Sequence, residues 1–198
     1  MKKILLLIVL AIFSASTVSA QLFKKKSKTV EPKYQAGAVT VTNGKVVFEE
    51  TIAADGLTAE EIEARVNAWM RSRFVEPTVI SAERHENREQ HTLTIKSEEY
   101  IVFKSSALVL NRARIYYTLT VAAKEGSCNV KMSQISYWHD EEGEKGGIKD
   151  MKAEEWITDK VSFDKKGRLK KFEGRFRSKT IDLKDTLVNE LKRVLNSK

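Results

Sequence analysis

Apolar and polar residues alternate most regularly over residues 112–138, and this alternation predicts a long β-hairpin. Odd positions of its first strand are apolar or aromatic and even positions are mostly polar, which is the period of a strand with one buried face. Glu125-Gly126 supplies a short turn between the two strands. That turn places Val121 opposite Val130, so the two strands are predicted to bury the same face.

The other face of this predicted hairpin carries the candidate binding site. Toward the open end of the hairpin, the same register puts Tyr116 opposite Ile135 and Arg114 opposite Tyr137. Aromatic side chains on an otherwise polar sheet face form a platform on which a ligand can stack. The candidate ligand-binding residues are therefore Arg114, Tyr116, Ile135 and Tyr137.

Two alternatives would remove this platform. A β-bulge near Ser133-Gln134 would shift the side chains that follow it and turn Ile135 and Tyr137 into the core. Alternatively, the segment around Trp156 or another loop would cover them, since large apolar patches are uncommon on monomers. The candidate site thus depends on whether the register continues past Ser133.

The flanking segments predict an α+β fold, in which two main helices pack on one face of an antiparallel sheet. Asn43-Gly44 lies between alternating runs at Ala38–Thr42 and Lys45–Ile52, a strong signal for a hairpin. Thr58–Glu61 is a capping box that opens one helix, and an apolar stripe over Leu183–Leu195 predicts the other. Further expected strands are Thr78–Glu83, Thr92–Lys96, Tyr100–Phe103 and Ala107–Leu110, with Leu169–Phe176 as a last strand or extended cover.

The first twenty residues have the pattern of a signal peptide. Two lysines precede an apolar run at residues 4–13, which is too short to span a bilayer comfortably, and small residues lead up to Ala20. We therefore expect cleavage after Ala20 and a periplasmic or secreted protein; the alternative is a retained N-terminal anchor. A flexible basic linker is expected at 21–36 and a single α+β domain at 37–198.

Charge and cysteine content narrow the function classes. The formal net charge of +8 falls by two, to +6, when the two lysines of the signal are removed. Such a mild excess argues against a nucleic-acid groove. Peripheral contact with a membrane is expected at most through the linker residues Lys24, Lys25, Lys26 and Lys28. Cys128 is the only cysteine, so no internal disulfide is possible, and its place in the alternation favours a small buried residue.

The sequence contains no recognisable catalytic or metal-binding motif, and we expect no cofactor. The spacing of His85 and His91 does not match a zinc-ligand set, and both are expected near a solvated hairpin tip. The acidic stretch 139–150 lacks the pattern of a calcium loop and is expected to be a surface loop. A hydrolase that uses His85, His91 or His139 with the acids of residues 139–144 is an alternative without a supporting motif.

Several structural motifs of the chain resemble a known family. Its members are exported proteins of gut-type Gram-negative bacteria with a domain of unknown function and a TATA-binding-protein-like fold. The similar segments are Gly44–Phe48, the helix over Gly56–Trp69, and Tyr117–Val121 with the turn at Lys124–Gly126, within Asn43–Tyr137. The resemblance implies an antiparallel sheet with helices on one face and supplies no catalytic residues. Likeness to a DNA-binding fold does not imply DNA binding.

The sequence therefore favours a non-enzymatic binding or interaction module of the cell envelope. Its partner is an unknown envelope molecule, which the open face of the sheet would bind. Besides the hydrolase, the remaining alternative is self-association through an edge strand such as Ala38–Thr42.

Overall fold

The alternating segments of the chain form one antiparallel sheet with the strand order β3-β7-β6-β5-β4, and β8 pairs with β7. The structure, a computed structural model, describes residues 30–106, 109–143 and 145–197, so the expected signal peptide and the linker lysines lie outside the described residues. The strands of the sheet are β3 (Phe48–Ala53), β4 (Val79–Asn87), β5 (Thr92–Ser106), β6 (Val109–Lys124), β7 (Ser127–His139) and β8 (Ile148–Lys152).

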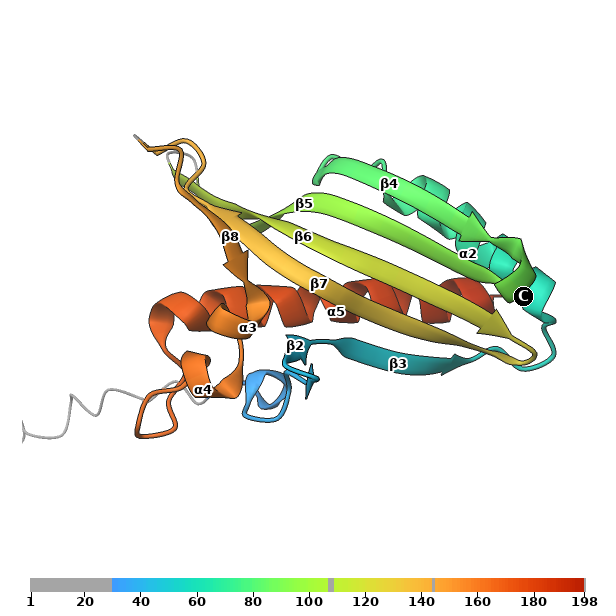
Figure 1. Ribbon diagram of the computed structural model, residues 1–198, viewed down its shortest axis with the longest axis horizontal. Helices are drawn as coiled ribbons and strands as arrows, with labels where there is room; N and C mark the ends of the chain where they lie inside the picture. The colour runs from blue at the N-terminus through green and yellow to red at the C-terminus, as the bar shows by residue number, and fades with distance from the viewer. Residues whose placement is uncertain (1–29, 107–108, 144, 198) are drawn as a thin grey trace, which may run out of the picture.

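Two long helices, α2 (Ala59–Arg73) and α5 (Lys171–Asn196), cover one face of this sheet. Figure 1 looks onto the opposite face, with both helices behind the strands. The α+β prediction is therefore confirmed. The shorter elements are η1 (Pro32–Tyr34), η2 (Arg88–Gln90), α3 (Ala153–Trp156) and α4 (Asp159–Ser162).

The predicted start of α2 is confirmed by its capping box. The Glu61 backbone N–H donates to the Thr58 hydroxyl at 3.2 Å, and the Thr58 N–H donates to the Glu61 carboxylate at 2.8 Å. These bonds satisfy two backbone donors that a helix N-terminus leaves free. The large apolar residues of this helix and of its C-cap are buried; they are Ile62, Val66, Trp69, Met70 and Phe74.

The first predicted hairpin is present but shorter than expected. Asn43 and Gly44 both have positive φ, as a type I′ turn requires, and join β1 (Val41–Thr42) to β2 (Lys45–Val46). The chain then leaves this pairing, and β3 pairs with β7 instead. The predicted second strand is thus divided between two sheets.

The central hairpin has the predicted register from its turn to Ser133. Val121 lies opposite Val130 and Leu119 opposite Met132, and all four side chains are buried. The predicted strand Tyr100–Phe103 belongs to β5, and the next one, predicted to end at Leu110, overlaps the start of β6. The two long strands β5 and β6 pair as one antiparallel hairpin. This hairpin and its pairing with β7 build the layer that supports the open face.

Two segments differ from the prediction at the end of the sheet near α5. Phe172 and Phe176, expected in a last strand or extended cover, lie in the first turns of α5, where their spacing of four residues places them on one helical face. Gly174 is required there because a Cβ would lie 2.6 Å from Leu169 Cγ. Residues 30–36, expected as linker, include η1 and pack against α5, so the folded part begins before residue 37.

Candidate functional site

A β-bulge at Gln134 determines which residues reach the open face. Thr118 lies opposite Ser133, but Tyr116 lies opposite Ser136, so β7 contains one extra residue between these pairs. Gln134 takes up the extra length with a left-handed backbone, at φ 55°. Ile135 and Tyr137 are consequently turned toward the helices and are 2% and 0% exposed.

The prediction that Ile135 and Tyr137 share the open face with the other two candidates is therefore wrong. Tyr137 packs its ring 5.1 Å from that of Phe176, and its hydroxyl lies 2.7 Å from the Thr180 hydroxyl. Burial raises the pKa of Tyr137 well above its usual value. The bulge alternative holds, and the side chains of these two residues stabilise the core instead of forming a platform on the open face.

Arg114 and Tyr116 do lie on the open face, as predicted, in what we call the open-face cluster: Arg114, Tyr116, Trp138, Glu98 and Glu141. Trp138 lies opposite Arg114 in place of Tyr137, and the guanidinium of Arg114 lies 4.5 Å from the centre of its ring. Arg114 donates to Glu98 at 2.7 Å and also to Glu141, in the loop between β7 and β8. Two carboxylates therefore neutralise the one guanidinium.

Tyr116 completes this cluster by donating its hydroxyl to Glu98 at 2.9 Å. Partial burial and the neighbouring Glu98 carboxylate raise the pKa of Tyr116 to about 12. Partial burial opposes ionisation of Glu98, but hydrogen bonds from Arg114 and Tyr116 outweigh it and lower the pKa of this carboxyl. At neutral pH the cluster is thus an ion-paired network in which the Glu98 and Glu141 carboxylates accept the hydrogen bonds of Arg114 and Tyr116. It holds the end of the sheet together and offers few free groups to a ligand.

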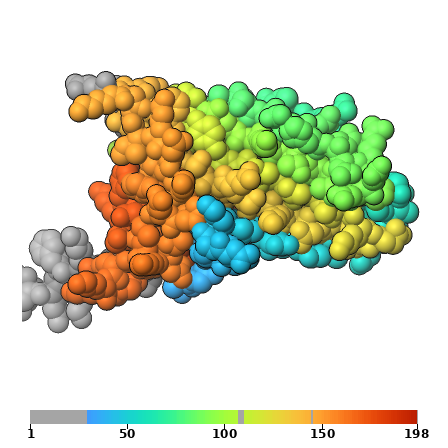
Figure 2. All heavy atoms as spheres, viewed as in Figure 1, coloured from blue at the N-terminus to red at the C-terminus, as the bar shows by residue number. Residues whose placement is uncertain are grey.

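Next to this cluster, two adjoining hollows lie on the open face and share Gln134. One, of about 460 Å³, lies over β4, β5 and β6 and is lined by polar groups that include Glu83, Lys96 and Tyr116. The other, of about 610 Å³, lies between the β1–β2 hairpin, β7 and β8. In the described part of the chain no helix lies over the centre of this face in Figure 1, and Figure 2 shows the green to yellow atoms of β4–β7 at its surface. Together, the two hollows form a candidate site that is larger than the open-face cluster.

Gln134 connects the two hollows and is available for binding. Its side-chain carbonyl accepts a hydrogen bond from the Thr118 hydroxyl at 2.7 Å, which leaves its amide N–H groups without a partner among the described residues. The sequence pattern placed Gln134 only at a possible bulge, because no glycine or asparagine marks the left-handed position. Trp138 was missed because the register without a bulge places Tyr137, and not Trp138, opposite Arg114.

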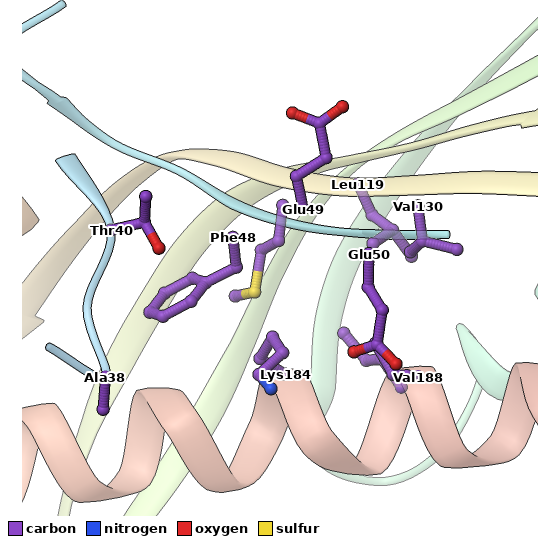
Figure 3. A pocket seen from close by; sticks show the side chains of 11 residues that line it. Ala38, Thr40, Phe48, Glu49, Glu50, Leu119, Val130, Lys184 and Val188 are labelled. Atoms are coloured by element: carbon purple, nitrogen blue, oxygen red, sulfur yellow. The ribbon is translucent and has the colours of Figure 1, made fainter. Parts of the chain in front are cut away.

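A smaller cavity lies behind the sheet edge, between β3 and α5. It measures about 150 Å³, and polar groups that include Glu50 and Lys184 line it together with apolar side chains, namely Phe48, Leu119, Val130, Met132, Leu187 and Val188. Figure 3 shows Phe48 and Glu50 pointing toward α5 and Glu49 pointing away. Glu50 pairs with Lys192 of α5 at 2.5 Å. A cavity of this size holds a group no larger than a benzene ring.

The three histidines do not assemble a hydrolytic centre in the described residues. His91 contacts Glu63 at 2.7 Å and Glu60 at 3.5 Å, so carboxylates occupy both ring nitrogens and tie β5 to α2. His85 pairs with Glu83 on the exposed edge strand β4, and His139 lies among aromatic rings beside Arg175. Among the described residues no three metal-ligating side chains gather at one place.

Cys128 is buried, in agreement with its predicted role as a small core residue. Burial raises the pKa of its thiol to about 11. The reactive form of cysteine is the thiolate, so this residue is unreactive near neutral pH.

The comparisons with known proteins agree with this fold. The model of a domain of unknown function with a TBP-like fold, DUF4468, matches residues 48–138. A solved DUF4468 family protein from Bacteroides ovatus ATCC 8483 is 31% identical, with 86% of this chain and 98% of that chain covered and a TM-score of 0.77. A solved TBP-like protein from Parabacteroides distasonis ATCC 8503 is 18% identical, with 81% and 99% covered and a TM-score of 0.63.

No curated protein matches this chain. The second solved structure shares the fold alone, since its identity is low, whereas the first also establishes common membership. Neither description assigns a ligand or a reaction, so the function has to be argued from the site itself. The chain belongs to the DUF4468 family of domains of unknown function with a TBP-like fold.

Proposed function

We propose that this protein is an exported, non-enzymatic binding module of the cell envelope, and that the open face of its sheet binds a polar ligand. The observation that carries the proposal is the pair of hollows joined at Gln134 on a face that no described helix covers. The signal-like pattern of the first twenty residues supports export. Concave surfaces with a small number of polar groups that can fix a ligand are typical of ligand sites.

The lining of the larger hollow favours a ligand with hydroxyl groups and negative charge. Its cations are Lys45, Lys131 and Lys152, and hydroxyl or amide groups come from Thr42, Asn43, Ser133, Gln134 and Ser136. Of its two carboxylates, Glu154 already accepts a hydrogen bond from the Val46 N–H at 2.9 Å. Ammonium groups bind carboxylates and phosphates as point charges. An acidic glycan of the cell envelope combines both features.

The test is binding of acidic and neutral envelope oligosaccharides, followed by chemical-shift mapping on the protein. We expect an acidic glycan to shift resonances around Gln134, and the double variant Lys131→Gln/Lys152→Gln to weaken binding at least tenfold. Each lost charge-assisted hydrogen bond is worth about 1.5–3 kcal/mol, so a tenfold loss is a lower limit.

The matched control, Lys104→Gln/Lys124→Gln, also removes two positive charges, but outside both hollows, and is expected to bind the glycan like the wild type. Both control lysines are exposed. The proposal fails if the acidic glycans shift only resonances away from the open face. It also fails if the two double variants bind equally well.

A further inference from the structure

We propose that a basic end of the domain, residues 159–171, docks on an anionic lipid surface. This stretch contains α4, the turn after it and the first residue of α5, and its basic residues are Lys160, Lys165, Lys166, Arg168, Lys170 and Lys171. Its two acidic residues are Asp159 and Asp164. The inference is independent of the ligand proposed for the open face, because no residue of this basic end lines either hollow there.

Both acidic residues of the basic end are used to build the fold. Asp159 pairs with the buried Arg177 at 2.8 Å and accepts the Gly37 N–H at 2.7 Å. Asp164 accepts the backbone N–H groups of Lys166 and Arg168, and it also pairs with the Arg168 side chain at 2.7 Å. These bonds lower the pKa of Asp164 to about 2. Neither carboxylate is left to neutralise the neighbouring lysines.

Four lysines of the basic end remain unpaired. Lys160, Lys165, Lys166 and Lys171 are exposed, and none of their ammonium groups has an ion pair or hydrogen bond within the described ranges. Lys165 and Lys166 lie in a turn that is closed by a short antiparallel bridge between Phe163 and Leu169. Lys160 lies in α4, and Lys171 is the first residue of α5. The positive charge is thus held on structured segments, seen in orange at and beside α4 in Figure 1.

The first described residue, Val30, lies at the basic end. It lines a hollow of about 860 Å³ together with Gly167, Arg168 and Lys171. In the sequence, Lys28 precedes Val30 by two residues, and Lys24–Lys26 by at most six. The contribution of these four lysines is therefore tested separately below.

Lipid fits this surface better than nucleic acid does. Single-stranded nucleic acid is bound by cations together with aromatic rings on which bases stack. The only aromatic residue of the basic end is Phe163, whose ring lies 5.0 Å from the Arg177 guanidinium. A lipid surface needs only accessible charge, and each basic residue near it strengthens partitioning by about fivefold. The apolar run at residues 4–13, if it serves export, also brings the chain to a membrane.

The experiment measures co-flotation of residues 21–198 with vesicles of phosphatidylcholine mixed with phosphatidylglycerol, and with vesicles of phosphatidylcholine alone. We expect binding to the mixed vesicles only, and loss of binding as salt rises. The loop variant K160Q/K165Q/K166Q/K171Q is expected to partition at least tenfold less. The matched control R71Q/K104Q/K124Q/K145Q removes four charges elsewhere and is expected to change partitioning less than threefold. Circular dichroism melting confirms that each variant folds.

Two further measurements distinguish the basic end from the basic tail that precedes it and from a nucleic-acid site. A tail variant with Lys24, Lys25, Lys26 and Lys28 changed to Gln is expected to keep part of the binding. The proposal is overturned if that variant loses all binding while the loop variant binds like the wild type. It is also overturned if the protein does not float with mixed vesicles at low salt, or if a single-stranded oligonucleotide binds at least as tightly as the vesicles do.

Discussion

Replacing Tyr137 with alanine is expected to lower the free energy of unfolding by about 3–5 kcal/mol, as removal of a large buried aromatic side chain does. The side chain is 0% exposed and lies between the sheet and α5, in contact with Phe176. Thr180 donates its own hydroxyl proton to the Phe176 carbonyl at 2.8 Å, so the Tyr137 hydroxyl is the donor in their shared bond. Alanine would leave both a cavity and an unpaired Thr180 oxygen.

Two matched variants identify the source of this loss in urea denaturation. Tyr137→Phe keeps the ring and loses one hydrogen bond, so about 1 kcal/mol is expected. Tyr116→Ala removes the same type of side chain from the open face, and the expected loss is about 1 kcal/mol because its ring is only partly buried. An equal loss of stability for Tyr116→Ala and Tyr137→Ala would contradict the burial of Tyr137 on the face opposite to Tyr116, and with it the bulge.

Replacing Arg177 with methionine is the second variant with a large expected effect, a loss of about 3–5 kcal/mol. This arginine of α5 is 0% exposed. It donates to the Tyr34 carbonyl at 3.0 Å, the Ile157 carbonyl at 2.8 Å and the Gln35 carbonyl at 2.6 Å, and it pairs with Asp159. Methionine fills similar space but leaves the Tyr34 and Ile157 carbonyls without a side-chain donor. The Gln35 carbonyl keeps only the Ala38 N–H, and Asp159 keeps only the Gly37 N–H.

The same variant is expected to release the segment around η1, because Arg177 holds two consecutive carbonyls of that segment. Limited proteolysis should therefore cut residues 30–37 faster in Arg177→Met than in the wild type. The control is Arg193→Met on the exposed side of α5, with an expected change within about 0.5 kcal/mol. Similar stability and similar cleavage in the two variants would contradict this role of Arg177.

Local patterns predicted the sheet and helices well because local chemistry determines them. The Asn43-Gly44 turn, the capping box at Thr58 and the alternation around Glu125-Gly126 each depend on residues close in sequence. The turn sets the register of the central hairpin, and the register then holds until Ser133. Period-two patterns also identified correctly which face of this hairpin is core.

The features that the sequence left as alternatives or missed depend on contacts distant in sequence. Gln134 adopts a left-handed conformation without the usual glycine, and what favours the bulge is the burial of Ile135 and Tyr137 against helices formed later in the chain. The anchoring of residues 34 and 35 likewise requires Arg177, more than 140 positions away. One extra residue moves each side chain that follows it in β7 to the opposite face of the sheet. This single bulge therefore buries two of the four candidate residues, Ile135 and Tyr137.

The two proposed surfaces are compatible with each other. The basic end lies beside Val30, whereas the two hollows lie along the sheet, on β-strands and the β1–β2 hairpin. Docking through residues 159–171 would therefore leave the open face accessible to a ligand. A small domain on a membrane surface would in this way present its polar sheet face to molecules of the envelope.

The most direct test concerns the bulge, since it decides which side chains the open face presents. Ile135→Cys and Ser136→Cys are treated separately with a thiol reagent under native conditions; the native Cys128 is buried, and its pKa is raised to about 11, so it contributes little. We predict that Ser136→Cys reacts as an accessible thiol and that Ile135→Cys reacts on the order of a hundredfold more slowly, through local opening only. Fast reaction of Ile135→Cys together with protection of Ser136→Cys would contradict the bulge and restore Ile135 to the open face.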